Sequence, residues 1–514
     1  MKPYTSDFPS QQLLAPAAGQ QNPPPVNPLT TPTVMLASRT FFQLEIEKQN
    51  TGDKAKPPPN KTPFSTFQDL VSNLSEHTKK QMQEYSHLAR LIQRFLLPYI
   101  RTLTPKLTQG TDTTVPATAE NEDDEYVAHE QKAVQDQNLV QAYLATSDVL
   151  EWLGKFCCNA FTICDAEFRP VGLGVFPEAA MINHSCRPNC HVLFDGLRLQ
   201  LRSIKKLRKE EEVTISYIEL ASTSAERRAA LRNGYFFQCS CPACCTTATD
   251  EMHILEKELT ALVCPKKDCK ESLYTSCIPP SSASEADGDS TQTPGKTLFR
   301  CCSCDFEETV VNEDGTDAQQ QTFLEGKDHQ QRGSKAASPK AQTIKGASPP
   351  PSLAALLDVL AEARQQRDDG NKHRSAGMLK EAQLELETAF SKFNKCAGNT
   401  NVERFRVACS LAHLCVDLGD WEKAASYYSS TLPGYKLIYP PNHPLIGLQF
   451  AAHGKLALHL NQLKQAYQSL NQAVEILKIT HGRAHSLVQE LSQLVCQVQI
   501  EIQHSSYDLD DLSQ

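Results

Sequence analysis

Three cysteines in the middle of the chain have a spacing typical of a metal site. Cys239, Cys241 and Cys244 form a C-x-C-x2-C cluster. Zinc takes four soft or borderline ligands in a tetrahedron, and a tight loop of this kind supplies three thiolates. The fourth ligand must come from elsewhere, and the competing donors are Cys186, which we favour, Cys190 and Cys245. The spacing predicts a zinc site and disfavours unconnected thiols.

A second group of cysteines follows. Cys264 and Cys269 form a C-x4-C pair, and Cys301 and Cys304 form a C-x2-C pair. Two such pairs could make a zinc ribbon that closes an excursion of 31 residues. The alternative is a loop with reduced thiols, because C-x4-C is less diagnostic than C-x2-C.

The distribution of cysteines points to the inside of the cell. No cysteine precedes Cys157, and fifteen of the 19 lie between Cys157 and Cys304. A secreted disulfide scaffold would be short and would follow a signal peptide, whereas the first residues here are polar. We therefore expect an intracellular zinc protein, in the cytoplasm and the nucleus.

Charge and hydropathy exclude other classes. The formal net charge of -9 gives no basic field for nucleic acid, and the short basic run Lys205–Lys209 fits a solvated turn. Apolar stretches of about 20 residues are absent from the sequence, which argues against a membrane-spanning helix. We expect neither a membrane protein nor a sequence-specific nucleic-acid binder.

The elements that must position these cysteines belong to several domains, since 514 residues exceed one core. Apolar residues three or four apart predict helices over 74–100 and 139–156, and alternation predicts strands over 159–164 and within 171–220. The predicted divisions are a disordered segment 1–32, a helical region 33–100, a disordered insertion 101–136, a β-rich core 137–238, a cysteine region 239–311, a disordered linker 312–351 and a helical domain 352–503.

The helical domain contains a repeat of 42 residues. A turn residue recurs at Gly377, Gly419 and Asn461, and an alanine follows each of them by five positions. Apolar residues then recur every four positions in the same register. This pattern indicates a stacked helix-turn-helix array and disfavours a helical bundle with accidental similarity.

Several motifs resemble the SET-domain lysine methyltransferases, and more narrowly their SET-and-MYND (SMYD) branch. They are Asn183-His184-Ser185-Cys186, the run Glu211–Tyr217 and the run Tyr235–Cys241. The segment Cys158–Ile163 is similar to the part before the family's core, and His481–Ser486 is similar to its tetratricopeptide-like domain. The resemblance implies an α+β fold, with a SET-type β domain, a zinc-bound post-SET loop and an all-α helical array.

The resemblance also implies roles for individual residues. Tyr217 would be the catalytic tyrosine, and Phe161 and Tyr235 would be aromatic walls of a lysine channel. The matches to the family's contacts with S-adenosylmethionine are Asn73, Asn159, Asn183, His184, Tyr217 and Phe237, with Asn73 the weaker match. The zinc ligands, which follow from the cysteine spacing and not from the resemblance, would be Cys186, Cys239, Cys241 and Cys244 at the first site and Cys264, Cys269, Cys301 and Cys304 at the second. Without the resemblance, the aromatic residues would fit a packed core and the Asn-His pair a turn.

Methyl transfer to lysine would require the residue types named above. A neutral lysine must line up with a sulfonium methyl group, which requires orientation, a dry channel and oxygen dipoles more than a strong base. Aromatic faces also attract the ammonium product.

The sequence departs from the family at three places, one of which is the second group of cysteines described above. The family begins with a Gly-x-Gly strand and a MYND finger with eight metal ligands; neither is found before Cys157, so we expect this chain to lack both. The glycine of the turn before the tyrosine strand is Glu210 here, and a positive φ at that turn would strain it by an energy on the order of 1 kcal/mol.

The sequence therefore predicts an S-adenosylmethionine-dependent methyltransferase for histone or non-histone lysines, with protein partners bound by the helical array. The alternative is a catalytically impaired SET-like scaffold that binds zinc and protein partners.

Overall fold

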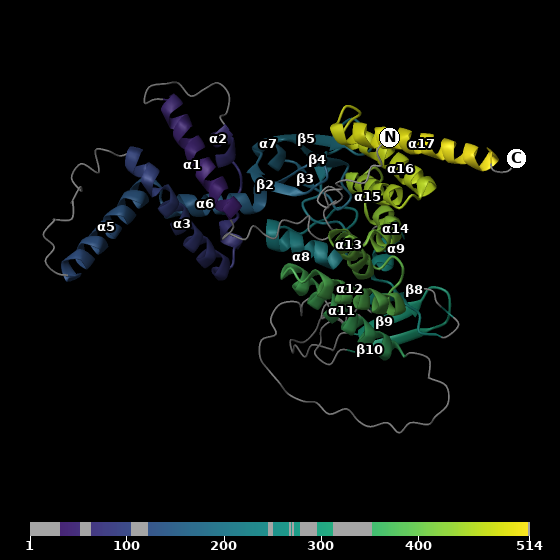
Figure 1. The fold of residues 1–514 in the computed structure, drawn as a ribbon. Helices are drawn as coiled ribbons and strands as arrows, with labels where there is room; N and C mark the ends of the chain where they lie inside the picture. Colours follow the sequence, from purple (N-terminus) through teal and green to yellow (C-terminus); the bar gives the residue numbers. More distant parts are fainter. Residues whose placement is uncertain are drawn as a thin grey trace.

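The computed structural model describes residues 31–51, 63–103, 122–244, 250–266, 269, 272–277, 296–311 and 352–511. Two segments predicted to be disordered, 1–32 and 312–351, lie outside this part of the chain, apart from residues 31 and 32. In Figure 1, the helices of residues 31–159 form one end of the molecule and the strands of residues 160–215 lie next to them, whereas the C-terminal helices and the strands of residues 262–311 form the other end.

The N-terminal end is a helical body with its own core. Its members are α1 (Thr31–Thr51), α2 (Pro63–Gln68), the 3-10 turn η1 (Leu74–Glu76), α3 (Lys79–Leu103), α5 (Glu122–Tyr143) and α6 (Thr146–Asn159). The helix predicted over 74–100 is interrupted between η1 and α3. Thr78 and Gln81 exchange hydrogen bonds in the manner of a capping box, with Thr78 N–H donating to Gln81 Oε1 at 2.8 Å. Helix α3 therefore begins after Thr78 and packs Leu88, Ile92 and Leu96 into the core.

The insertion predicted over 101–136 is only partly a break in the fold. Residues 104–121 lie outside the described chain, but residues 122–136 belong to helix α5, so their prediction as disordered was wrong. Packing decides this helix, because Val140 is buried in the core of the helical body and Asp136 pairs with Arg101 at 2.5 Å. The helix predicted over 139–156 is also divided, since α5 ends at Tyr143 and α6 begins at Thr146.

The β region consists of three two-stranded sheets. Strands β1 (Ala160–Cys164) and β2 (Pro170–Val175) pair antiparallel, as do β4 (Cys190–Asp195) and β5 (Arg198–Ser203). Between them in sequence come the short helix α7 (Pro177–Ala180) and strand β3 (Asn183–His184). Strand β6 (Thr214–Ile215) pairs parallel with β3, which places the Asn-His motif beside the approach to Tyr217.

The cysteine region has a separate four-stranded sheet. Helix α8 (Ser224–Tyr235) and helix α9 (Asp250–Thr260) precede it. The strands, in the spatial order β10-β9-β8-β7, are β10 (Glu307–Val311), β9 (Lys296–Cys301), β8 (Ser272–Cys277) and β7 (Leu262–Val263). Its apolar residues share a core with the first helices of the C-terminal domain. The sheet is therefore attached to the helical array.

The C-terminal domain is the predicted array of antiparallel helices. Its members are α11 (Leu353–Ser375), α12 (Leu379–Cys396), α13 (Val402–Asp417), α14 (Trp421–Ile438), α15 (Pro444–His459), α16 (Leu463–Thr480) and α17 (Ser486–Asp511). The repeated turn residues Gly377, Gly419 and Asn461 all have positive φ values, of 78°, 75° and 57°. Each repeated alanine that follows is fully buried. The repeat thus marks where the chain turns and where neighbouring helices cross closely.

The array packs against the β region through polar and apolar contacts. Arg406 in α13 donates to the Ala221 carbonyl at 2.9 Å and pairs with Glu226 at 2.8 Å. Asn442 donates to the Ile204 carbonyl at 3.1 Å. One apolar core runs across this interface. The array therefore borders any site that the strands of the β region form.

Candidate active site and metal centres

Tyr217 is held at the end of β6 by two hydrogen bonds to the Asn-His strand and the residue before it. Its backbone N–H donates to His184 Nδ1 at 3.0 Å, and its hydroxyl donates to the Ile182 carbonyl at 2.5 Å. Burial raises the pKa of the Tyr217 hydroxyl, so the group stays protonated near pH 7. Two oxygen atoms, one hydroxyl and one carbonyl, are thus fixed next to each other.

A cavity of about 180 Å³ lies beside Tyr217. The three aromatic residues predicted to form a channel, Phe161, Tyr217 and Tyr235, all line it. The rings of Tyr217 and Tyr235 have centroids 4.9 Å apart, and the Tyr235 hydroxyl donates to the Tyr217 carbonyl at 3.1 Å. Sites for drug-sized ligands have volumes of roughly 300–1,000 Å³, so this cavity suits a narrow alkyl chain and not a whole nucleoside.

The helical array closes the other side of the cavity. Tyr439 and His443 line it, together with His191 of strand β4. The His191 and His443 rings have centroids 4.7 Å apart, and burial lowers the pKa of both imidazoles, that of His191 to about 3. Both rings are therefore neutral near pH 7 and place no positive charge on the cavity wall. No motif in the sequence marks either histidine.

Two predicted cofactor asparagines lie side by side at the end of α6. Asn73 Nδ2 donates to Cys158 Sγ at 3.4 Å, and Asn159 Nδ2 donates to the Val71 carbonyl at 3.0 Å. The segment before η1 approaches α6 closely, because a side-chain carbon at Gly154 would lie 2.7 Å from the Ser72 carbonyl. Both amide nitrogens are thus held by the chain, which leaves the amide oxygens to accept hydrogen bonds from a ligand.

The remaining predicted cofactor residues surround Tyr217 from outside the cavity. Asn183 is exposed and donates from Nδ2 to Glu212 Oε1 at 2.7 Å. Phe237 packs within 6.1 Å of the His184 ring and 6.4 Å of the Tyr217 ring, between centroids. No contact joins the side chain of Asn183 to those of Asn73 and Asn159 among the described residues. Among the described residues, Asn73 and Asn159 thus form one group and Asn183, His184 and Phe237 another, with no hydrogen bond between the two groups.

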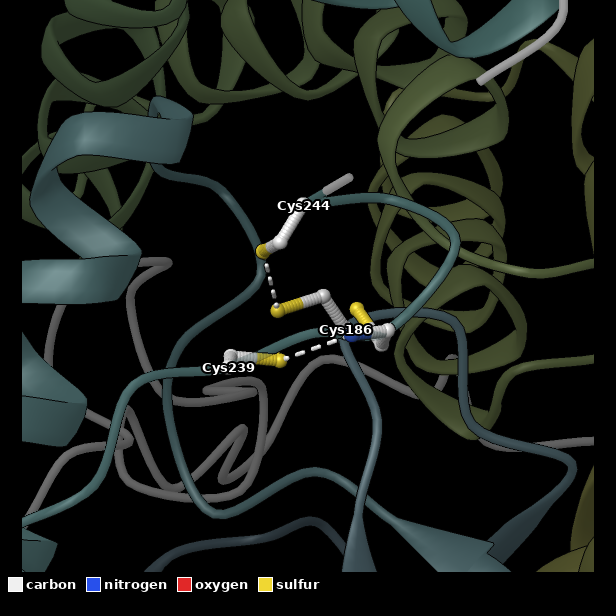
Figure 2. Close-up of side chains that lie close together, drawn as sticks. Cys186, Cys239 and Cys244 are labelled. Carbon is white, nitrogen blue, oxygen red and sulfur yellow. Dashed lines mark hydrogen bonds between the residues drawn. The ribbon is translucent and has the colours of Figure 1, made fainter. Parts of the chain in front are cut away.

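The first cysteine cluster has the geometry of a closed metal site. The sulfur atoms of Cys186, Cys239, Cys241 and Cys244 all lie within 4.8 Å of one another. Ligands about 2.3 Å from zinc in a tetrahedron would be about 3.8 Å apart, and the Cys186 and Cys244 sulfurs are 3.5 Å apart (Figure 2). Of the competing donors, Cys190 lies outside the cluster in β4, and Cys245 falls outside the described residues. Four soft ligands in this arrangement fit zinc.

His184 connects this cluster to Tyr217. Its Nδ1 accepts from the Tyr217 backbone, so in the neutral ring the hydrogen is on Nε2, which lies 3.2 Å from Cys186 Sγ. Burial lowers the pKa of His184 to about 4, which keeps the ring neutral. One imidazole therefore donates to a metal ligand and accepts from the backbone of Tyr217.

Two arginines of α8 border the same cluster. Arg228 donates from Nη2 to the Cys244 carbonyl, while the buried Arg227 lies close enough for the charges of Glu256, Cys186 and Cys244 to raise its pKa against the effect of burial. A zinc ion with four thiolate ligands carries two net negative charges, which a buried guanidinium offsets in part. No sequence motif marks these arginines, because they lie several residues before the C-x-C-x2-C motif and belong to no pattern of their own.

The second cysteine cluster also has four convergent sulfurs. Those of Cys264, Cys269, Cys301 and Cys304 lie within 4.8 Å of one another. The Cys264–Cys304 and Cys269–Cys301 sulfur distances are 3.7 and 3.6 Å. The two pairs are thus arranged as a ribbon site that could hold a zinc ion.

Comparison with known proteins agrees with this architecture. The model of the SET domain matches residues 56–218. The chain is 26% identical over 467 residues to histone-lysine N-methyltransferase ASHR1 of Arabidopsis thaliana, covering 90% of this chain and 74% of that protein. It is 24% identical over 463 residues to histone-lysine N-methyltransferase SMYD3 of Mus musculus, with the same shares of both chains. Human N-lysine methyltransferase SMYD2 is 21% identical over 336 residues, or 65% of this chain and 57% of that protein.

The β region, the cysteine loop and the helical array thus define a SET protein with a C-terminal helical domain. Residues 56–218 match the SET domain, and the chain is similar over 90% of its length to ASHR1 and to mouse SMYD3. Among the described residues, no helix is both long enough and apolar enough to cross a membrane.

Proposed function

We propose that this protein is an S-adenosylmethionine-dependent protein-lysine N-methyltransferase. The observation that carries the proposal is the position of the Tyr217 hydroxyl. It is held against the Ile182 carbonyl at 2.5 Å, at the wall of an aromatic cavity that Phe161 and Tyr235 also line. The relatives named as histone-lysine or N-lysine methyltransferases support the same reaction.

The cavity would bind the target lysine side chain. Its aromatic walls pack on the methylene groups and exclude water, and burial lowers the pKa of an amine. The lysine would therefore reach Tyr217 in its neutral, nucleophilic form. The small volume favours an extended alkyl chain with its amine at the Tyr217 end.

The cofactor would bind next to the cavity, because it is too large to enter it. Asn73, Asn159, Asn183, His184 and Phe237 are the proposed contacts. Both nitrogens of the His184 ring are engaged by the chain, so this residue would contact the cofactor through its backbone. When bound, S-adenosylmethionine supplies an electrophilic methyl group on a sulfonium. The Tyr217 hydroxyl and the Ile182 carbonyl present oxygen dipoles that would orient this positive group.

The first cysteine cluster would hold a zinc ion that fixes the chain from Tyr235, the last residue of α8, through Phe237. The second cluster would hold another zinc ion in the ribbon. We propose protein substrates, histone or non-histone, with the array contributing to their recognition, and a location in the cytoplasm and the nucleus.

The direct test is transfer of a labelled methyl group to lysine. The zinc-loaded full chain is incubated with labelled S-adenosylmethionine and with histones or lysine-containing peptides, and the product is identified by mass spectrometry. Tyr217→Phe should lower turnover by about 10²–10³-fold, in the range found when one oxyanion-hole donor is removed. Binding of the cofactor by calorimetry should persist in this variant.

A matched control is Tyr427→Phe, which removes a hydroxyl from a half-buried tyrosine of α14 outside the cavity. It should leave turnover unchanged. If the zinc-loaded chain binds the cofactor but transfers no methyl group to any lysine, the protein is a scaffold that retains the SET architecture. Equal loss in both tyrosine variants would show that Tyr217 acts only through stability.

A further inference from the structure

Helices α1 and α3 carry a cluster of apolar side chains that are open to solvent. Of the fifteen large apolar residues that are exposed in the described part of the chain, five lie on these two helices. They are Met35, Phe42 and Ile46 on α1 and Leu91 and Phe95 on α3. None of the five lines the cavity of the candidate active site, so this surface is separate from that site.

The two helices present these side chains on one continuous surface. The three residues on α1 are spaced by seven and four positions, so they form a stripe on one face of the helix. On α3, Leu91 and Phe95 are one turn apart, and the half-buried Tyr99 follows after one further turn. The rings of Phe42 and Tyr99 meet edge-on with centroids 4.8 Å apart, and Figure 1 shows α1 and α3 as neighbours at one end of the molecule. The stripes of the two helices therefore join where Phe42 meets Tyr99.

The exposed charges on the same surface are all positive. Among the described side chains of α1 and α3, no exposed residue is acidic, whereas six are basic, namely Arg39, Lys48, Lys79, Lys80, Arg90 and Arg94. Arg39 lies in the α1 stripe, one turn after Met35, and Arg90 and Arg94 directly precede the two apolar residues of α3. Of the six, Lys48 alone forms an ion pair within the described chain, with Glu45. A protein with a net charge of -9 thus has a local surface that is both apolar and positive.

We propose that this surface binds an acidic amphipathic helix of a partner protein. Such a helix packs apolar side chains, three and four residues apart, onto an apolar surface of its partner. Its carboxylates would pair with Arg39, Arg90 and Arg94, whose guanidinium groups bind carboxylates through two parallel hydrogen bonds. A basic segment would be repelled, so the occupant differs from the lysine-containing substrates of the proposed methyl transfer. An anionic membrane fits less well, because inserting the α1 stripe would also carry Arg39 into the apolar layer.

Binding of model peptides to the full chain tests this proposal, with fluorescence anisotropy as the measurement. The probes are labelled peptides of about 18 residues, long enough to form a helix, with Leu or Phe at helical spacing and Glu at the other positions. The unaltered protein should bind them at least about tenfold more tightly than peptides with the same residues in scrambled order or with Lys in place of Glu. Binding should weaken as the salt concentration rises, because exposed charges are screened.

Two substitutions of exposed residues separate the apolar and the charged contributions. Phe95→Ala should weaken peptide binding at least about tenfold, as the loss of an interface anchor does. Arg94→Glu should weaken it at low salt and have a smaller effect at high salt. The matched controls are Ile500→Ala on α17 and Arg198→Glu on β5, which are also exposed but lie outside α1 and α3. Both controls should bind the peptides as the unaltered protein does, and all four variants should keep its melting temperature.

Three results would overturn the proposal. The first is that no acidic peptide binds, or that Phe95→Ala and Arg94→Glu bind as tightly as the unaltered protein. The second is tighter binding to phosphatidylserine vesicles than to the peptides in a flotation assay, which would identify a membrane surface. The third is self-association in sedimentation that Phe95→Ala abolishes, which would identify a contact between two copies of the chain. None of these measurements requires methyl transfer, so the proposal stands or falls independently of the proposed function.

Discussion

The two cysteine clusters have the same ligands and nearly the same sulfur distances, but they lie in different surroundings. The first cluster is bordered by His184, which also holds the backbone of Tyr217, and by the buried Arg227. The second lies on a small sheet that packs on α11 and α12, where the nearby ion pair between Lys266 and Asp305 is exposed. The zinc ion proposed for the first cluster would therefore support the candidate active site, whereas the ion proposed for the second cluster would support only the local fold.

The largest expected effect comes from breaking the first cluster. Cys239→Ser should reduce the zinc content from two ions to one and lower methyl transfer at least 100-fold, because metal binding and folding of the loop are coupled. Elemental analysis and the labelled-methyl assay measure both. Cys190→Ser is the matched control, since Cys190 is also buried but lies outside the cluster. Unchanged activity in Cys239→Ser would show that methyl transfer does not depend on metal binding by the first cluster.

The next effect concerns pH and involves four histidines, of which His184 borders the first cluster and the others lie where the β region meets the array. Burial lowers the pKa of His184 to about 4 and that of His191 to about 3, and it lowers the pKa values of His443 and His481 as well. These rings bind protons more readily when the chain is unfolded, where the pKa is about 6.5. The stability they provide is present above pH 6.5 and decreases as the pH falls toward 4, by up to about 1.4 kcal/mol per pH unit for each ring.

Chemical denaturation at a series of pH values tests this dependence. His191→Gln should reduce the slope between pH 6.5 and 4, and the exposed His87→Gln should leave it unchanged. A flat profile in the unaltered protein would mean that burial does not lower the pKa values of these rings in solution.

Breaking the second cluster should have a smaller effect on activity. Cys304→Ser should also remove one zinc ion, but methyl transfer should stay within about threefold, because no described contact joins the ribbon to the cavity. Cys302→Ser changes an exposed neighbour outside the cluster and should retain both ions. A loss as large as that of Cys239→Ser would show that the two clusters act as one.

The smallest expected effect is at the turn before β6. Glu210 has a φ of 67°, which confirms the positive φ expected where the family has glycine. Glu210→Gly should raise the free energy of unfolding by about 1 kcal/mol, less the extra entropy that glycine gives the unfolded chain. Glu212→Gly, at a residue that accepts from Asn183, should lower it instead.

The sequence predicted those parts of the site that depend on local spacing. The cysteine clusters and the turns of the repeat were identified because short motifs and a fixed period specify them. The roles of Ile182, Arg227 and His443 were not predicted, because these residues act through a backbone carbonyl or through packing between segments that are distant in the sequence. Residues 122–138 of helix α5 were missed for a related reason: packing of this helix on α3, with the ion pair between Arg101 and Asp136, stabilises it rather than its composition.

The most direct measurement is a zinc titration of the metal-free Cys304→Ser variant, in which only the first cluster can bind. Zinc content and transfer of labelled methyl groups to lysine are followed at each addition. Methyl transfer should rise in proportion to zinc and reach its limit at one ion per chain. A protein that takes up this ion and stays inactive, or one that is fully active before any zinc is added, would contradict the control of Tyr217 by the first cluster.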